Sequence, residues 1–285
     1  MPELPEVETI RRDLNAKIVN KKINLVEVRK INMIKGAKLK FINNLKNNQI
    51  IKADRIGKLM IFDLASGDHL LIHLKMTGQL IYIIKNDVTA GGHDWPQADA
   101  LPNKFSHIIF HFSDGSQLFF NDLRQFGYMQ IVNSQDRDNI KQKFGIEPLQ
   151  ANFTWNNFEK LFENRKTILK PFLLNQQMIS GIGNIYADEI CFRAKVLPNR
   201  RLNTLSEAEQ KKIFQAIKYI IKKAIEQRGT TFSNYLDSDG KSGNFSDQLK
   251  VYGRGGEKCL RCRQSLIKKV KLGGRGTTFC SQCQK

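Results

Sequence analysis

The sequence predicts an α+β protein with a β-rich N-terminal part, a helical part and a small C-terminal cysteine module. Short β-branched segments separated by turn signals fill residues 1–135. From about residue 152, apolar residues recur at the three- and four-residue spacing of amphipathic helices. The predicted organisation is a β-sandwich over 1–135, a linker over 136–151, a helical domain over 152–250 and a metal-binding module over 251–285.

The first part begins with a helix, expected over residues 5–20 because Pro5 suits a first helical turn and acidic residues precede basic ones. The expected strands are INLVEVRKINMI, QIIKADRI, KLMIFDL, HLLIHLKM, QLIYII and FGYMQIV, with SHIIFHF and QLFF joined as a hairpin by SDGS. Strands this close in sequence indicate an antiparallel sandwich with flanking helices or a barrel. The segment DVTAGGHDWPQADALPNK is expected to be a long loop.

The second part carries four helical segments: NNFEKLFENR, KPFLLNQQMI, NIYADEICFRAK and SEAEQKKIFQAIKYIIKKAIEQ. Ser206 and Glu209 form a capping box for the last of these. The polar stretch TTFSNYLDSDGKSGNFSDQ that follows is expected to be a loop.

The charge of the chain favours a polyanionic partner. The 285 residues contain 46 Lys and Arg against 27 Asp and Glu, a net charge of +19. Residues 136–285 hold 28 of the basic and 14 of the acidic groups. An excess concentrated in one half of a chain is typical of nucleic-acid binding, or of binding to an anionic membrane surface. No apolar run reaches the roughly 20 residues that span a bilayer.

Four of the five cysteines form two CxxC pairs, Cys259–Cys262 and Cys280–Cys283, and the fifth, Cys191, is expected to be a small buried hydrophobe. The sequence shows no export signal, so a reducing cytoplasm is expected and metal-bound thiolates are favoured over disulfides. Two such pairs supply four ligands for one tetrahedral zinc, which has a structural role because no coordination position stays open. The segment between the pairs turns at GGRG and predicts a β-hairpin.

Further residues stand at positions where side chains or backbone amides can contact DNA. Asn184 is placed to cap a helix, and a helix N-terminus also suits phosphate. Arg275 lies in the GGRG turn, where an ordinary solvated arginine is an equal alternative. Met76, Arg124 and Phe126 follow strands, so they can enter a duplex, although Met and Phe at such spacing are more often core residues. From these residues alone the chain is a zinc-stabilised, two-domain nucleic-acid-binding protein.

Together, the motifs resemble those of one family. The segments MPELPEVET, HLKMTG, NDLRQFG, QMISGIGNIYADE, VYGRGGEKC and GGRGTTFCSQCQK are similar, in order, to those of bacterial formamidopyrimidine-DNA glycosylase, the enzyme that removes 8-oxoguanine. The resemblance covers essentially the whole chain. It implies a helix-two-turn-helix domain before the zinc-ribbon hairpin, and a bacterial, nucleoid-associated monomer that acts on damaged double-stranded DNA.

The resemblance also implies the catalytic residues. Met1 is removed, and the secondary amine of Pro2 attacks C1′ of the damaged nucleotide; β- and δ-elimination then cut the strand. Glu3 is the general acid and base, Glu6 helps to position base and sugar, and Lys58 contacts phosphate and assists catalysis. Taken without the resemblance, the two glutamates are simply acids in the first turn of a helix.

The remaining implied residues contact DNA. Asn184, Arg275 and, as a weaker match, His73 bind phosphates of the damaged strand. Met76, Arg124 and Phe126 fill the space left by the flipped base, and Arg124 pairs with the orphaned cytosine. Residues 229–247 match a lid over the base, in which Thr231 or Ser233 read the lesion. The GGHDWPQAD loop and Asn175 depart from the family pattern.

Three alternatives remain open. Endonuclease VIII, a relative of the same architecture, prefers oxidised pyrimidines, whereas Leu4, Arg124 with Phe126 and the long 229–247 stretch favour the purine enzyme. A non-catalytic zinc-dependent DNA-binding protein would bind damaged duplex without nicking it. A basic membrane-surface protein would need an amphipathic helix with a broad basic face, which neither end of the chain shows.

Overall fold

The computed structural model describes residues 1–85, 87–92, 101–230 and 245–285 of the chain. Its elements form two compact units, residues 1–142 with 227–246 and residues 143–226 with 247–285. The four-part division of the chain given above remains a prediction. Residues 227–246 were expected in the helical domain, but they belong to the first compact unit.

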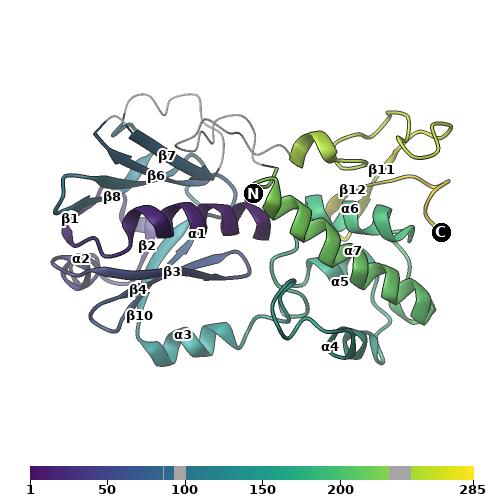
Figure 1. The fold of residues 1–285 in the computed structure, drawn as a ribbon, viewed down its shortest axis with the longest axis horizontal. Coiled ribbons are helices and arrows are strands. Elements are labelled where there is room, and N and C mark those ends of the chain that lie inside the picture. The colour runs from purple at the N-terminus through teal and green to yellow at the C-terminus, as the bar shows by residue number, and fades with distance from the viewer. Residues whose placement is uncertain (86, 93–100, 231–244) are drawn as a thin grey trace. The chain divides into compact units, whose positions relative to one another are not determined.

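Two five-stranded sheets form the first unit (Figure 1). Their orders are β1-β8-β9-β6-β7 and β2-β10-β5-β4-β3. The strands are β1 (Ile23–Val28), β2 (Ile34–Lys35), β3 (Ile50–Ile56), β4 (Leu59–Leu64), β5 (His69–His73), β6 (Gly78–Ile84), β7 (Asp87–Gly92), β8 (Ser106–Phe112), β9 (Gln117–Asp122) and β10 (Tyr128–Val132). All neighbours are antiparallel except β2 and β10. Side chains from both sheets, such as Phe62 and Phe110, meet in one buried core, so the predicted sandwich is confirmed.

Helices cover the two open sides of this sandwich. Helix α1 (Leu4–Ile18) packs against β3 and β7, the edge strands of the two sheets (Figure 1). Helix α2 (Lys38–Leu45) packs against β1 and β10 on the other side. The apolar stripe of α1 is buried because Val7, Ile10, Leu14 and Ile18 recur at helical spacing.

Three elements of this unit differ from the sequence-based expectation. Residues 87–92, expected in a loop, pair with β6 as strand β7, and the GGHDWPQAD segment runs on into residues 93–100, outside the described part. Helix α2 was not expected, since only Phe41 and Leu45 of its residues are buried. Helix α3 (Ser134–Lys141) occupies part of the predicted linker. It was not predicted because its sequence lacks an apolar stripe, and it buries no residue.

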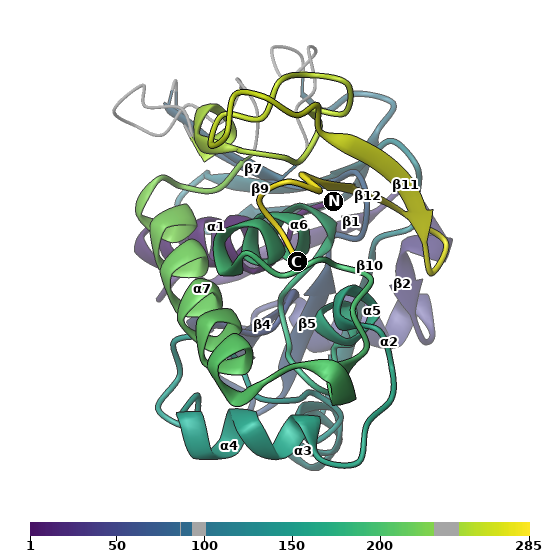
Figure 2. The same cartoon turned by 90° about the vertical axis from the view of Figure 1, so that its right-hand side faces the viewer.

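The second unit consists of helices and a small β-hairpin (Figure 2). The helices are α4 (Trp155–Glu159), α5 (Leu169–Leu174), α6 (Asn184–Ala194) and α7 (Glu207–Glu226), with 3-10 turns at Lys160–Phe162 and Leu202–Thr204. Two further 3-10 turns lie elsewhere in the chain, at Ile31–Met33 in the first unit and at Phe245–Gln248 where the chain passes from the first unit to the second. Helix α7 packs against α6, and its buried residues include Ile213, Ile217 and Ile221. Its predicted capping box is confirmed, because Ser206 N donates to Glu209 and Glu209 N donates to Ser206 Oγ.

The hairpin pairs β11 (Lys268–Leu272) with β12 (Arg275–Phe279), as the turn signal GGRG predicted. Gly273 and Gly274 both have positive φ, 55° and 77°, which a two-residue turn of this type requires. Strand β12 packs on α6. The whole therefore matches the predicted α+β class, with antiparallel sheets, a helical region and a C-terminal hairpin.

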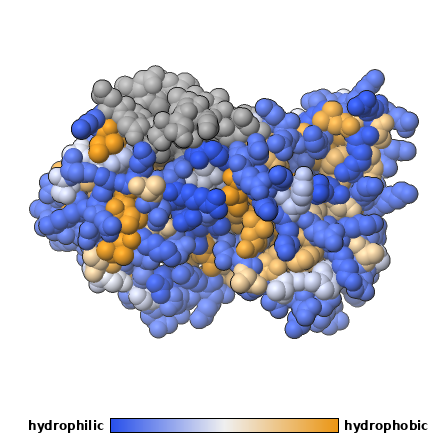
Figure 3. Space-filling model, in the orientation of Figure 1, coloured by the Kyte–Doolittle hydropathy of each residue, from blue (hydrophilic) through white to orange (hydrophobic). Residues whose placement is uncertain are grey.

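Within the described residues, no helix is at once long and apolar enough to cross a membrane. The face of the molecule in Figure 3 is mostly hydrophilic, with scattered apolar patches.

Candidate active site and metal centre

The first residues of the chain lead into a tightly capped helix. Glu3 is the residue before α1, and its backbone N–H donates to Glu6 Oε2 at 2.9 Å. Both carboxylate side chains are buried. Pro2 is buried as well, while Met1 is 44% exposed. With Met1 attached, the nitrogen of Pro2 is an amide, so only removal of this exposed residue produces the amine.

Glu6 also holds a second segment of the first unit. Its Oε1 accepts hydrogen bonds from Thr230 N at 2.7 Å and from Thr230 Oγ1 at 3.1 Å. Arg228 adds an ion pair to Asp13 of α1 at 2.6 Å. Thr231 and Ser233, the predicted lesion-reading residues, lie outside the described residues, as does most of the predicted lid.

Lys58 lies at the turn between β3 and β4 and is buried. Its charge acts on His73 at the end of β5, together with the charges of Lys75 and Lys35. Burial first, and then these three ammonium groups, lower the pKa of His73 to about 3. Because Lys75 N donates to His73 Nδ1 at 3.1 Å, the neutral ring carries its proton on Nε2 and can donate it to an anion.

Met76, Arg124 and Phe126 belong to two turns that one buried carboxylate joins. Asp122, fully buried at the end of β9, accepts hydrogen bonds from Arg124 N at 3.2 Å and Gly127 N at 2.7 Å. Thr77, next to Met76, donates its hydroxyl to the same carboxylate and accepts from Arg124 N at 2.9 Å. The sequence analysis did not single out Asp122, although it lies within the quoted NDLRQFG motif.

The side chains that these turns carry reach the surface. Phe126 is 54% exposed. Sequence spacing alone favoured a core position for it, and the structure shows that it is a surface residue instead. The guanidinium of Arg124 lies 4.8 Å from the centre of the Phe126 ring. Gly127 has no room for a side chain, because a Cβ there would lie 2.8 Å from Phe120 Cζ. An aromatic ring and an arginine are thus presented together on a rigid turn.

In the second unit, Asn184 is the first residue of α6, and the residue that caps the helix is Gly183. The expectation that Asn184 is the N-cap is wrong by one position. Its Oδ1 is buried and, among the described residues, has no hydrogen-bond partner. Asn184 lies at the N-terminus of an eleven-residue helix, and a helix N-terminus still suits a phosphate.

Two neighbouring acids of α6 hold the C-terminal module to this helix. Asp188 forms an ion pair with Lys170 of α5 at 2.7 Å and accepts Thr278 N and Oγ1, both at 2.9 Å. Lys170 Nζ also donates to Gly276 O at 2.8 Å. Burial raises the pKa of Asp188, while Lys170 and Thr278 oppose that shift. The hairpin that carries Arg275 is therefore bonded directly to α5 and α6.

Glu189, the next residue of α6, accepts hydrogen bonds from the backbone amides of Lys250, Val251 and Tyr252 at 2.8–3.0 Å. Sequence reasoning missed both acids, since the motif NIYADE shows them only as helical residues.

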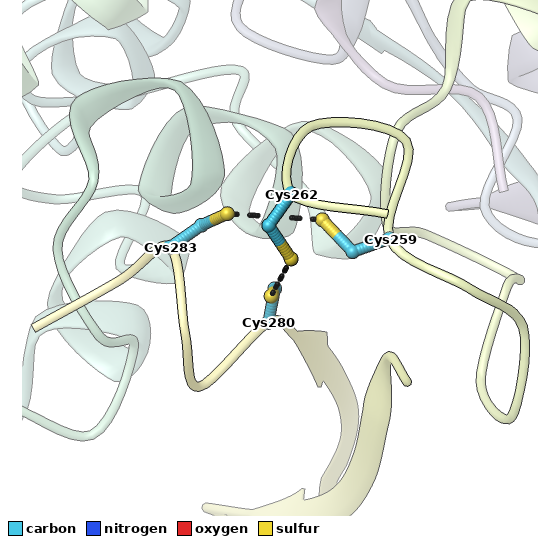
Figure 4. A group of neighbouring side chains, drawn as sticks. All are labelled: Cys259, Cys262, Cys280 and Cys283. Carbon is cyan, nitrogen blue, oxygen red and sulfur yellow. Dashed lines mark hydrogen bonds between the residues drawn. The ribbon is translucent and has the colours of Figure 1, made fainter. Parts of the chain in front are cut away.

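The four paired cysteines converge on one point (Figure 4). Their sulfur atoms all lie within 4.8 Å of one another, and the Cys259–Cys283 and Cys262–Cys280 sulfurs are 3.8 Å apart. A zinc–sulfur distance of about 2.3 Å in a tetrahedron requires sulfur–sulfur separations of about 3.8 Å. The cluster therefore fits one structural zinc with all four positions filled by protein. Cys191 lies apart from it and is buried, as expected.

Three family models match the chain in sequence. They are Formamidopyrimidine-DNA glycosylase N-terminal domain over residues 1–129, Formamidopyrimidine-DNA glycosylase H2TH domain over 144–235, and Zinc finger found in FPG and IleRS over 256–285.

Curated relatives named formamidopyrimidine-DNA glycosylase are similar over their full length. One from Pelotomaculum thermopropionicum is 40% identical over 288 residues, covering 100% of this chain and 99% of the relative. One from Listeria innocua is 41% identical and covers 100% of both chains.

Solved structures give the same result. The complex of Lactococcus lactis Fpg with DNA containing an abasic site has a TM-score of 0.87 and 34% identity, covering 99% of each chain. The complex of wild-type Lactococcus lactis Fpg with DNA containing N7-benzyl-Fapy-dG has a TM-score of 0.87 and 34% identity, covering 100% of each.

Proposed function

Because the chain belongs to the formamidopyrimidine-DNA glycosylase family, we propose that it excises oxidised purines from damaged double-stranded DNA and then cleaves the strand as a lyase. The observation that carries this proposal is the capped N-terminal end of α1, where Pro2 precedes the buried carboxylates of Glu3 and Glu6. The relatives are bacterial, so we place the enzyme in the bacterial cytoplasm, associated with the nucleoid through DNA.

Removal of Met1 gives Pro2 a secondary amine. An α-amine has a pKa of about 8, against about 10.4 for lysine, so a larger share is free base near neutrality. The amine attacks C1′ as the bond from C1′ to the base breaks, and the base leaves with a proton that Glu3 supplies. The attached amine then gives up its own proton to Glu3, which passes it to the sugar ring oxygen, and the bond from C1′ to that oxygen breaks. The resulting iminium acidifies the C2′ proton, whose loss expels the 3′ phosphate; a second elimination expels the 5′ phosphate, and water then releases Pro2.

The other residues bind and distort the DNA. Lys58, His73, Asn184 and Arg275 contact phosphates, and Glu6 positions the damaged nucleotide. Base flipping costs a few kcal/mol, which insertion of Met76, Arg124 and Phe126 offsets. The exposed Phe126 ring and the adjacent Arg124 guanidinium support this role. One zinc at the four cysteines holds the hairpin, and the protein acts as a single chain.

Borohydride trapping tests the proposal. Incubation with a duplex that pairs 8-oxoguanine with cytosine is expected to give a covalent adduct that maps to Pro2. Pro2→Gly, or retention of Met1, is expected to suppress elimination. An adduct on another residue would refute the role of Pro2. Faster excision of thymine glycol than of 8-oxoguanine would favour the pyrimidine enzyme, and binding without nicking would favour a non-catalytic protein.

A further inference from the structure

A buried carboxylate one turn beyond the capping box collects three guanidinium groups. Glu8 accepts Arg11 Nη2 at 2.8 Å, Arg12 Nε at 2.6 Å and Arg55 Nε at 2.7 Å. Burial alone would raise the pKa of Glu8, but the bonds from Arg11 and Arg12 and the charge of Arg55 lower it to about 2. Glu8 is therefore ionised at every pH at which the enzyme would be assayed.

The three arginines contribute differently. Arg11 and Arg12 belong to α1 itself, three and four residues beyond Glu8, so their bonds to Glu8 fix the orientation of its side chain within the helix. Arg11 Nη1 also donates to Ala53 O of β3 at 3.4 Å. Arg55 comes from β3, and its side chain is 7% exposed. It is the arginine of this set that connects Glu8 itself to the sheet.

Arg55 makes a second directional bond. Its Nη1 donates to Gly57 O at 3.4 Å, and Gly57 directly precedes Lys58 in the β3–β4 turn, where its φ is +54°. A continuous chain of polar contacts thus runs from α1, the helix that follows Pro2 and Glu3, through Glu8 and Arg55 to the peptide that carries Lys58.

Asn15 and Arg11 of α1 also bond the backbone of Ala53 in β3, at 3.0 and 3.4 Å. The guanidinium of Arg55 differs from them because its two donors link the helix to the turn that carries Lys58.

We propose that Glu8 and Arg55 are positioning residues that fix Lys58 relative to the Pro2 amine and the Glu3 carboxylate. The proposal rests on the roles of Pro2 and Lys58 given above. Displacement of a reacting group by about 1 Å can cost about 100-fold in rate. We therefore expect loss of this link to slow chemistry strongly while leaving the surface that binds DNA in place.

The experiment uses the full-length, zinc-loaded protein with Met1 removed. Arg55→Lys keeps the positive charge but lacks the planar fork whose Nε and Nη1 bond Glu8 and Gly57 O. Glu8→Gln removes the charge of the acceptor. The single-turnover rate of 8-oxoguanine excision and the yield of borohydride-trapped Pro2 adduct are measured beside the affinity for a duplex containing an abasic-site analogue. We expect the rate to fall about 10- to 100-fold and the affinity to change less than about 3-fold.

The matched control is Lys52→Ala. Lys52 lies on the same strand and pairs with Asp54 at 2.8 Å, but it is exposed and does not bond α1. Its rate is expected to equal that of the wild type. Thermal unfolding identifies any variant that does not fold. If Glu8→Gln fails to fold, the rate and affinity of Arg55→Lys, the milder change, test the proposal alone.

A double-mutant cycle with Lys58 separates positioning from general stability. If Arg55 acts through Lys58, Arg55→Lys has little further effect in a Lys58→Ala background. A full multiplicative loss in that background, a wild-type rate in both single variants, or a loss of affinity at an unchanged rate would each overturn the inference. Absence of a Pro2 adduct in the wild type would instead refute the proposed function.

Discussion

The ion pair between Lys170 and Asp188 gives a prediction whose size follows from its burial. The two side chains are 0% and 1% exposed, and their charged groups lie 2.7 Å apart. Asp188→Asn keeps an oxygen for Thr278 but leaves the Lys170 ammonium buried without a counter-charge. Removing one partner of such a pair costs about 3–5 kcal/mol in free energy of unfolding. At about 3 °C per kcal/mol for a unit of this size, the Tm is expected to fall by about 10–15 °C.

The same change is expected to weaken DNA binding, because the pair holds the strand that carries Arg275. Lys170 donates to Gly276 O, and Asp188 accepts from Thr278 N. If Arg275 contacts one phosphate, the slope of log affinity against log salt is expected to fall by about one. Thermal unfolding and a salt titration of duplex affinity measure the two effects.

Glu207→Gln is the control for this prediction, because Glu207 and Lys211 form an exposed pair in α7. It is expected to cost less than about 0.5 kcal/mol in free energy of unfolding. An Asp188→Asn protein that unfolds within about 1 kcal/mol of the wild type would show that the pair does not hold the hairpin.

Four further predictions concern other sites. Chelation of zinc is expected to unfold the C-terminal hairpin and abolish tight duplex binding; full binding by metal-free protein would contradict the structural role. Arg124→Ala is expected to reduce the preference for cytosine opposite the lesion, which excision from duplexes with each of the four opposing bases measures; an unchanged preference counts against it. His73, whose pKa is about 3, is expected to show no NMR titration between pH 8 and 5. Its folded pKa lies below the unfolded value, so its contribution to stability is lost as the pH falls from about 6.5 towards 3; a midpoint above pH 6 would refute the neutral ring. Glu8, with a pKa of about 2, contributes stability that is complete above about pH 4.5 and is lost as the pH falls towards 2, so Glu8→Gln is expected to flatten acid unfolding over that range.

Most of the secondary structure could be predicted from the sequence because it follows from the pattern of apolar residues. The strand His69–His73 contains a short continuous apolar run, and the helix over Glu207–Glu226 repeats apolar residues at helical spacing. Strand β7 could not, since the glycines and alanine of DVTAGG have low strand propensity and pairing with β6 decides its conformation. Helix α3 was missed because it buries nothing.

The site divides in a similar way. The zinc ligands could be predicted because metal geometry constrains cysteine spacing in the chain itself. The residues that support these side chains could not be predicted. Asp122, Arg55 and Asp188 form hydrogen bonds with groups distant in sequence: Thr77, Glu8 and Thr278 respectively. Nothing in a local pattern distinguishes such a residue from a solvated charge until the fold brings its partners to it.

The position of α1 between the edge strands β3 and β7 has a consequence for solubility. Strand edges that are not covered can pair with strands of other chains and so begin aggregation. The helix that follows the proposed nucleophile therefore also covers two such edges. Substitutions that detach it from the sheets should cause precipitation as well as loss of repair, so that the yield of soluble protein and the rate of excision fall together.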